Sequence, residues 1–251
     1  MLDEARSDDI VILTLNQPAR RNALSKAMRD QLSAAFKRLE EDRTVRTIIL
    51  TGAGGTFCSG GDISEMQVAD TADAGERIDG IHHMVRTIAG SSKLVIAAIE
   101  GWAAGAGLSL ALLCDTLVAT STAKFVASFG KIGLAGDLGI LQTLPARIGA
   151  AQARQMLFYA EAVDSEQAAR IGLVDHLALE GSAIDTALRR AALVRSIGPL
   201  PLAATKTILS GGLEATLSRE REAQMALYVS GDHAEGKRAF LEKRPAIFRA
   251  R

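Results

Sequence analysis

The sequence predicts an α/β protein that ends in a purely helical region. β-rich runs alternate with helical patterns through the first half of the chain, which is typical of an α/β core. Within it, the stretch from Gly101 to Asp115 joins a buried strand to a buried helix through a turn of glycine and alanine residues. Beyond Gly198-Pro199-Leu200-Pro201, the strongest breaker of the chain, only helical periodicity remains. We therefore divide the chain into a core, residues 1–197, and a helical C-terminal region, residues 198–251.

The core begins with a strand, a helix and a strand. Ile10 to Leu15 is a β-rich run closed by Asn16-Gln17-Pro18, and Val45 to Thr51 is a second β-rich run. Between them, Ser25 is placed to cap a helix whose apolar residues recur at helical spacing up to Glu41. This is a β–α unit, and the pattern then repeats.

The repeat continues through the middle of the chain. The polar, alanine-rich stretch from Gln67 to Glu76 is expected to be exposed and mobile, and a helix with one apolar side follows from Ile78 to Ile88. Leu94 to Ile99 is the strand that leads into the small-residue turn, and Thr116 to Thr120 and Lys124 to Phe129 are shorter strands. These elements complete the alternation that predicts the core.

Helices dominate after the strand signals fade near Gln152. Asp164 to Gln167 forms a capping box for a short helix that stops near Gly172. Three helices are expected in the C-terminal region, the last of them capped by Asp232. They lie at Leu202–Leu209, Leu213–Val229 and Ala234–Lys243.

Composition argues against several kinds of partner. Lysine plus arginine and aspartate plus glutamate number 29 each, so no overall charge attracts nucleic acid or an anionic membrane. The longest uncharged apolar segment, Gly101 to Cys114, is shorter than the about 20 residues that span a bilayer. Cys58 and Cys114 lack the spacing of a metal or redox site, and the first residues lack a secretory pattern. These features indicate a cytoplasmic protein without a metal site.

Two glycine-rich turns carry the chemical signal. The first, Phe57-Cys58-Ser59-Gly60-Gly61-Asp62, lies between a strand and a helical pattern, and the second contains Gly105-Ala106-Gly107. Small residues leave the backbone N–H groups open to another group, and a helix N-terminus favours negative charge. Close packing of strand and helix explains either turn alone. Two such turns could instead direct two N–H groups at one oxygen atom, which is how an oxyanion hole is built.

The chain resembles the crotonase superfamily, also called the enoyl-CoA hydratase/isomerase family. The resemblance rests on both turns and on Asn22-Ala23-Leu24, Ile132-Gly133-Leu134 and Gly172-Leu173-Val174, which occur in family order along nearly the whole chain. It implies a crotonase (ClpP-like) fold, a spiral of ββα turns with a helical C-terminal trimerisation region. It also implies an acyl-CoA thioester substrate, with coenzyme A as part of the substrate and no separate cofactor, and a homotrimer or a dimer of trimers.

By the same resemblance, the backbone N–H groups of Gly61 and Ala106 bind the thioester carbonyl oxygen and stabilise an enolate. Hydratases of the family carry two glutamates at positions that are Ser109 and Phe129 here, and neither of these side chains offers a carboxyl group. Asp137 matches the catalytic aspartate of some Δ3,Δ2-enoyl-CoA isomerases. We therefore expect a double-bond isomerase in which Asp137 carries the proton.

Other interpretations stay open. One is enoyl-CoA hydration with an unidentified base, and another is a non-catalytic CoA-binding protein. The family's 4-chlorobenzoyl-CoA dehalogenases place a nucleophilic aspartate at the position of Asp137 and a histidine at that of His82, so hydrolysis through a covalent ester is a third. From the local pattern alone, Asp137 is the N-cap of a helix that begins at Leu138, and His82 is an ordinary helix residue. The apolar neighbours Phe129, Leu134 and Leu138 are expected to raise the pKa of Asp137.

The resemblance also assigns six residues to coenzyme A. One precedes Asn22 as the family's phosphate-contacting residue does, and three match positions around the adenine and pantetheine. Two more match a segment that a neighbouring subunit lends to the site. The phosphate-contacting position is Arg21, and the positions around the adenine and pantetheine are Ala23, Asp62 and Ile63. The positions in the segment from the neighbouring subunit are Phe240 and Lys243.

Overall fold

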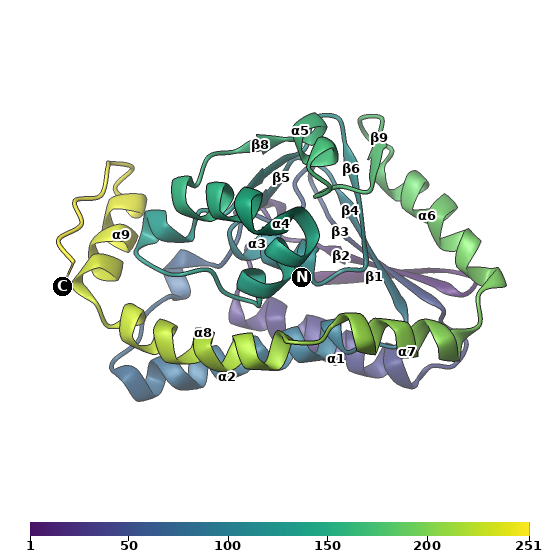
Figure 1. The fold of residues 1–251 in the computed structure, drawn as a ribbon, viewed down its shortest axis with the longest axis horizontal. Helices are drawn as coiled ribbons and strands as arrows, with labels where there is room; N and C mark the ends of the chain where they lie inside the picture. Colours follow the sequence, from purple (N-terminus) through teal and green to yellow (C-terminus); the bar gives the residue numbers. More distant parts are fainter. Residues whose placement is uncertain (251) are drawn as a thin grey trace.

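Two β-sheets form the centre of the structure, a computed structural model that describes residues 1–250 (Figure 1). The larger sheet has the strand order β1-β2-β3-β4-β6-β9, and the smaller has the order β5-β7-β8. In the larger sheet β1 is antiparallel to β2, and the remaining neighbours are parallel. The strands are β1 Leu2–Ser7, β2 Ile10–Leu15, β3 Thr47–Gly52, β4 Leu94–Ile99, β5 Trp102–Ala104, β6 Thr116–Thr120, β7 Lys124–Val126, β8 Val163–Asp164 and β9 His176–Ala178.

Helices cover both faces of the larger sheet. Figure 1 shows α1, α2, α7 and α8 along one side of the molecule, α3 and α4 near its centre and α6 beside the far end of the sheet. The α-helices are α1 Lys26–Glu41, α2 Thr71–Ala89, α3 Ala106–Leu112, α4 Ile140–Tyr159, α5 Ser165–Arg170, α6 Ala183–Leu193, α7 Pro199–Leu209, α8 Leu213–Tyr228 and α9 Gly231–Leu241. Short 3-10 turns are η1 Pro18–Arg20, η2 Ile63–Glu65, η3 Phe129–Ile132 and η4 Val194–Ser196.

The two faces of the sheet belong to separate apolar clusters because side chains alternate along each strand. In β3, Ile48 and Leu50 join the main cluster, which includes side chains from α1, α2 and α3. Ile49 points the other way, into a smaller cluster with the alanines of α6. A strand buried on both faces reads as a continuous apolar run, which is why β3 and β4 were predictable.

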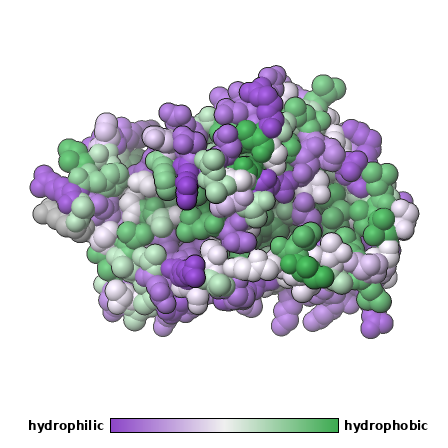
Figure 2. Space-filling model, viewed as in Figure 1, coloured by the Kyte–Doolittle hydropathy of each residue, from purple (hydrophilic) through white to green (hydrophobic). Residues whose placement is uncertain are grey.

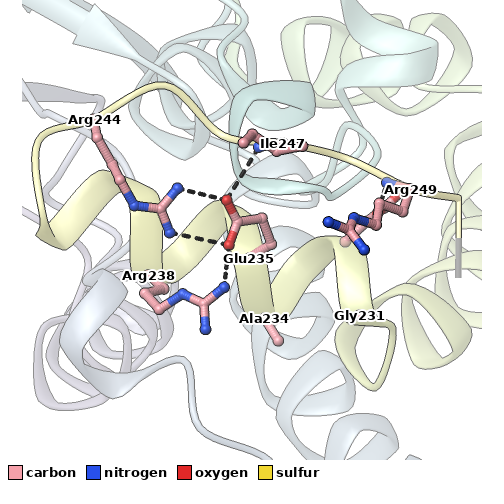
Figure 3. A pocket seen from close by; sticks show the side chains of 8 residues that line it. Gly231, Ala234, Glu235, Arg238, Arg244, Ile247 and Arg249 are labelled. Atoms are coloured by element: carbon pink, nitrogen blue, oxygen red, sulfur yellow. Dashed lines mark hydrogen bonds and ion pairs between the residues drawn. The ribbon is translucent and has the colours of Figure 1, made fainter.

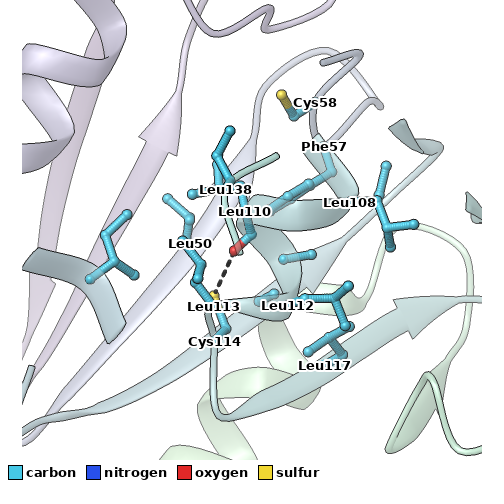
Figure 4. Close-up of a cluster of buried hydrophobic side chains, with 14 of the residues drawn as sticks. Leu50, Phe57, Cys58, Leu108, Leu110, Leu112, Leu113, Cys114, Leu117 and Leu138 are labelled. Atoms are coloured by element: carbon cyan, nitrogen blue, oxygen red, sulfur yellow. Dashed lines mark hydrogen bonds between the residues drawn. The ribbon is translucent and has the colours of Figure 1, made fainter. Parts of the chain in front are cut away.

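Helix α3 lies inside the main cluster, with all seven of its residues buried. Figure 4 shows Leu108, Leu110 and Leu112 of this helix among side chains of neighbouring elements, with Leu50 and Phe57 close by. This burial explains why the sequence carries no charge between Gly101 and Cys114. It also holds the second glycine-rich turn firmly, since that turn begins α3.

Several sequence predictions are confirmed at the level of single elements. Strands β2, β4 and β6 have the predicted bounds. Ser25 is the N-cap of α1, where its side chain accepts the N–H of Met28. Asp164 caps α5 by accepting the N–H of Gln167.

Other expectations were wrong. The stretch from Gln67 to Glu76 is not wholly exposed, because α2 already begins at Thr71 with Asp70 as its cap, and Ala74 is buried. Helix α9 begins at Gly231 and its cap is Ser230, not Asp232. Asp232 instead accepts the backbone N–H groups of the C-terminal tail at residues 249 and 250.

Strands β1 and β9 and helix α6 were not predicted at all. Strand β1 is mostly exposed and polar, so it lacks the apolar alternation that reveals a strand. Among residues 1–250, no helix is both long and apolar enough to cross a membrane.

Candidate active site

The two glycine-rich turns lie against each other because Cys58 of the first turn pairs with β5, the short strand before the second turn. Cys58 donates its N–H to the carbonyl of Trp102 at 2.9 Å, and Ala104 donates to the carbonyl of Cys58 at 3.0 Å. The approach continues into the turns. A β-carbon added at Gly60 would lie 2.9 Å from the carbonyl oxygen of Ala104 and 3.6 Å from the amide nitrogen of Ala106. Only glycine fits at this position, where the backbone also has a positive φ of 111°.

The N–H groups of Gly61 and Ala106 have no hydrogen-bond acceptor among residues 1–250. Ala106 is the first residue of α3, whose first N–H groups have no partner within the helix. Gly61 pairs with Leu24 in an isolated bridge, but the bonds of that bridge use the carbonyl of Gly60 and the N–H of Asp62. Two unused backbone donors in adjacent turns are the arrangement that an oxyanion hole requires.

The segment at Asn22 is bound to the first turn. Asn22 is fully buried and donates its side-chain amide to the carbonyls of Ala53 and Thr56, at 2.9 and 2.6 Å. Leu24 donates its N–H to the carbonyl of Gly60, at 2.8 Å. One buried amide side chain therefore fixes this segment beside the candidate oxyanion hole.

Four of the residues matched to coenzyme A come together here. Arg21 is exposed and Ala23 is buried, and Asp62 and Ile63 follow Gly61 directly. Asp62 is bound to the side chain of Arg20 at 2.7 Å and accepts hydrogen bonds from Ser64. Burial alone would raise the pKa of Asp62, but the hydrogen bonds from Ser64 and Arg20 hold it below its usual value. Asp62 is therefore a charged residue that caps η2.

Asp137 is buried in the segment between η3 and α4. Phe129, Leu134 and Leu138 are all buried, and Asp137 itself is only 8% exposed. Its Oδ1 atom has no hydrogen-bond partner among the described residues. The local interpretation of Asp137 as a helix cap is wrong, because α4 begins at Ile140 and its N-cap residue is Gly139.

Burial raises the pKa of Asp137 to about 8, and the negative charge of Glu220 adds to this effect. Arg77 and Arg29 act in the opposite direction. The expected rise in pKa is thus present, with burial as its main cause. A carboxyl group of this kind holds a proton near neutral pH and releases it at a slightly higher pH.

The two positions of the hydratase glutamates offer no carboxyl group. Ser109 is completely buried in α3 and its hydroxyl oxygen has no partner in residues 1–250, and Phe129 belongs to η3. His82 is buried in α2, with its Nε2 atom 3.0 Å from a carboxylate oxygen of Glu220. This ring is therefore held in a buried pair, which does not suit a role in activating water.

Phe240 and Lys243 lie elsewhere, at the end of α9. Phe240 is exposed, and α9 packs on η3 and α8 of its own chain. Beside it, a pocket of about 590 Å³ opens between α9 and the C-terminal tail. Figure 3 shows Arg244 reaching back from the tail to Glu235, with the two nitrogen–oxygen distances at 2.6 and 3.0 Å. None of the residues that line this pocket belongs to either glycine-rich turn, so it is not the candidate active site.

Comparison with known proteins decides the family. The family model described as "Enoyl-CoA hydratase/isomerase" matches residues 5–251. The chain belongs to the enoyl-CoA hydratase/isomerase family. It is 34% identical to a mitochondrial methylglutaconyl-CoA hydratase of Mus musculus, over 98% of this chain and 81% of that protein. It is 35% identical to a 1,2-epoxyphenylacetyl-CoA isomerase of Escherichia coli K12, over 95% and 94% of the two chains.

The fold prediction is confirmed at the same time. The crystal structure of an enoyl-CoA hydratase from Mycobacterium avium subsp. paratuberculosis K-10 superposes with a TM-score of 0.89 and 30% identity. It covers 99% of this chain and 98% of that one. The protein is therefore a crotonase-fold enzyme of the enoyl-CoA hydratase/isomerase family, which acts on acyl-CoA thioesters. Its relatives include both hydratases and an isomerase, so their names do not select the reaction.

Sequence reasoning missed the polar groups that surround Asp137. They come from α1, α2 and α8, far from it in the chain. The available signal was in α8, where Glu220, Gln224 and Tyr228 are spaced by four residues and continue the buried stripe of Leu213 and Leu217. Polar residues on the inward stripe of a helix are rarely accidental, because each needs a partner.

Proposed function

We propose that this enzyme moves the double bond of an enoyl-CoA from the Δ3 to the Δ2 position, with Asp137 as its acid and base. The observation that carries the proposal is the buried Asp137 carboxyl, which has a raised pKa and an oxygen atom without a partner in residues 1–250. The absence of a carboxyl group at Ser109 and Phe129 supports a single-carboxylate mechanism over hydration.

In the proposed mechanism, the carbonyl oxygen of the thioester is bound by the N–H groups of Gly61 and Ala106. The Asp137 carboxylate removes a proton from C2, and the electron pair moves into the thioester carbonyl to give an enolate. The two N–H groups stabilise the negative charge on that oxygen. The Asp137 carboxyl then returns the proton to C4 as the double bond forms between C2 and C3. No water or external reductant takes part, so atoms and electrons balance.

The acidity of Asp137 gives the reaction a definite pH dependence. The carboxylate form is needed for the first step, and its fraction grows as pH rises through the pKa of about 8. We therefore expect kcat/KM to increase between about pH 7 and pH 9 and then to level off. With an ordinary exposed aspartate, kcat/KM would show no such rise above about pH 5.

Hydration is the second candidate, and the names of several relatives favour it. The methylglutaconyl-CoA hydratase of Mus musculus and a 2,3-dehydroadipyl-CoA hydratase of Escherichia coli K12 are 34% and 33% identical to this chain. A water-activating base other than a glutamate would then be needed.

Two further alternatives have less support or a different outcome. Hydrolysis of the dehalogenase kind is disfavoured by the pairing of His82 with Glu220. A non-catalytic protein would bind acyl-CoA without turnover.

The decisive experiment compares the wild-type enzyme with Asp137→Asn. Both receive a 3-enoyl-CoA and, separately, a 2-enoyl-CoA, while the absorbance of the conjugated enoyl thioester is followed. We expect absorbance to rise with the 3-enoyl substrate, and kcat to fall by about 10²- to 10⁴-fold in the variant. Asp79→Asn, which changes an exposed carboxylate of α2, is the control and should keep full activity. Falling absorbance with the 2-enoyl substrate in both proteins would overturn the proposal in favour of hydration.

A further inference from the structure

One helix of the C-terminal region holds both ends of the segment that carries Asp137. In α8, Gln224 donates its side-chain amide to the carbonyl of Ala135 at 2.8 Å. Glu220, one helical turn earlier, accepts the N–H of Gly139 at 3.0 Å. Both side chains are buried. Asp137 therefore lies between two anchoring points that belong to the same rigid helix.

The segment needs this support because its backbone conformation is unfavourable. Leu138 has a positive φ of 55°, a region that residues with large side chains rarely adopt, and Gly139 follows with a φ of 76°. Gly139 is also the residue before α4, so its N–H has no partner within that helix. The carboxylate of Glu220 supplies the missing acceptor and thereby stabilises the turn.

Glu220 is itself fixed in place. Its other carboxylate oxygen lies 3.0 Å from Nε2 of His82 in α2, and the side chains of the pair are 1% and 2% exposed. A fully buried carboxylate is tolerated only when several groups satisfy it, and here two elements do so. The position of the turn is thus tied to the packing of α2 against α8.

We infer that Glu220, held by His82, is the positioning residue of Asp137. It keeps Leu138 and Gly139 in their left-handed conformation and places a second negative charge beside the reacting carboxyl. The inference rests on the proposed function for the catalytic role of Asp137. The physical effect on the Asp137 side chain does not depend on which reaction the enzyme performs.

The charge of Glu220 acts within a set of groups contributed by several helices. Burial is the main cause of the raised pKa of Asp137, the charge of Glu220 is the next, and two arginines lower it. Tyr228 accepts a hydrogen bond from one of these arginines at 3.4 Å and packs edge-on against His233. The groups that act on Asp137, or that contact those that do, are Arg29 of α1, Arg77 and His82 of α2, Glu220 and Tyr228 of α8 and His233 of α9.

The first test measures the Asp137 carboxyl directly. Asp137 is titrated by ¹³C NMR in protein labelled at the aspartate side-chain carbons, and its signal is identified by its loss in Asp137→Asn. Glu220→Gln keeps an oxygen for Gly139 but removes the charge, so we expect the pKa of Asp137 to fall by about one unit. The control Glu214→Gln removes a charge from the same helix, where Glu214 forms an exposed pair with Arg86. It should leave the pKa of Asp137 unchanged.

An unchanged titration in Glu220→Gln would overturn the inference. Because the measurement needs no substrate, it separates this outcome from a failure of the proposed function. That failure would appear as a wild-type enzyme without isomerase activity, whatever the titration shows.

The second test separates positioning from binding. Glu220→Leu has a similar size but accepts no hydrogen bond, so the turn loses its anchor. We expect kcat to fall about 100-fold while KM changes less than about 3-fold, since the oxyanion-hole donors stay in place. A wild-type kcat in this variant would contradict the inference. If circular dichroism shows that Glu220→Leu does not fold, Glu220→Gln provides the test instead. In that variant, kcat/KM should rise at a lower pH than in the wild type.

Discussion

At the scale of single residues, Asp137 shows a conflict between stability and chemistry. A buried carboxyl group resists ionisation, and an interior oxygen without a partner in residues 1–250 lowers stability. The same two properties make it a basic carboxylate that is free to approach a carbon atom. Its residue type and position were recognisable from the family resemblance. The raised pKa was also expected, whereas the buried pair of His82 and Glu220 was not, because these two residues are separated by 138 positions in the chain.

The conflict predicts how Asp137→Asn changes stability with pH. The folded state of the wild type holds the Asp137 proton up to about pH 8, whereas the unfolded chain loses it near its ordinary pKa of 3.8. This stabilising contribution is complete below about pH 4 and is lost as pH rises towards 8. Asparagine does not titrate, so the variant should gain stability relative to the wild type by up to about 1.4 kcal/mol per pH unit in that window.

Urea denaturation at several pH values between 4 and 9 measures this difference. Asp79→Asn is a suitable control because the hydrogen bond from Arg221 lowers the pKa of Asp79. The stabilising contribution of the Asp79 charge is fully present above the pKa that Asp79 has in the unfolded chain. Asp79→Asn should therefore change the free energy of unfolding by the same amount across this pH range. A stability difference for Asp137→Asn that does not change with pH would show that the carboxyl titrates normally.

At the scale of secondary structure, the elements that could be predicted are those with a local signal. Helix α1 has a capping serine and an apolar stripe, and β4 is a continuous apolar run. Strand β1 has neither, since it forms only by pairing with β2 at the edge of the sheet. The inward role of α8 was equally hidden, because its partners in α2 and at Gly139 are distant in the chain.

The close approach of α3 to the first turn gives a second prediction. A β-carbon added at Gly107 would overlap the carbonyl oxygen of Cys58 and lie 2.8 Å from its β-carbon. Gly107→Ala should therefore push the two turns apart, with a loss of about 1–3 kcal/mol in stability and a fall in kcat as the oxyanion-hole donors separate.

Gly130→Ala is the matched control, since no described atom lies within 4 Å of a β-carbon added there. Thermal unfolding and the absorbance assay check both variants. Equal behaviour of the two would mean that α3 adjusts freely, which its complete burial argues against.

At the scale of the whole molecule, the C-terminal region has an inward and an outward face. Helix α8 packs on α2 and supports Asp137, whereas α7 has no buried residue. Leu200, Ile208 and Leu209 of α7 are 81%, 78% and 79% exposed. Figure 2 shows apolar side chains gathered over this part of the surface. An apolar helix left open to water is unusual in a monomer and is typical of an interface.

The expected homotrimer, or dimer of trimers, stays a prediction, and this surface provides its test. We expect sedimentation equilibrium to give the mass of a trimer or hexamer for the wild type. Ile208→Glu combined with Leu209→Glu should shift it towards the monomer, because buried unpaired charges oppose association. Leu179→Glu, at an equally exposed leucine before α6, is the control and should keep the wild-type mass.

If Phe240 and Lys243 contact coenzyme A across the interface, the dissociated variant should also show a higher KM for acyl-CoA. A monomeric wild type at micromolar concentration would contradict the prediction and would leave these two residues without a site.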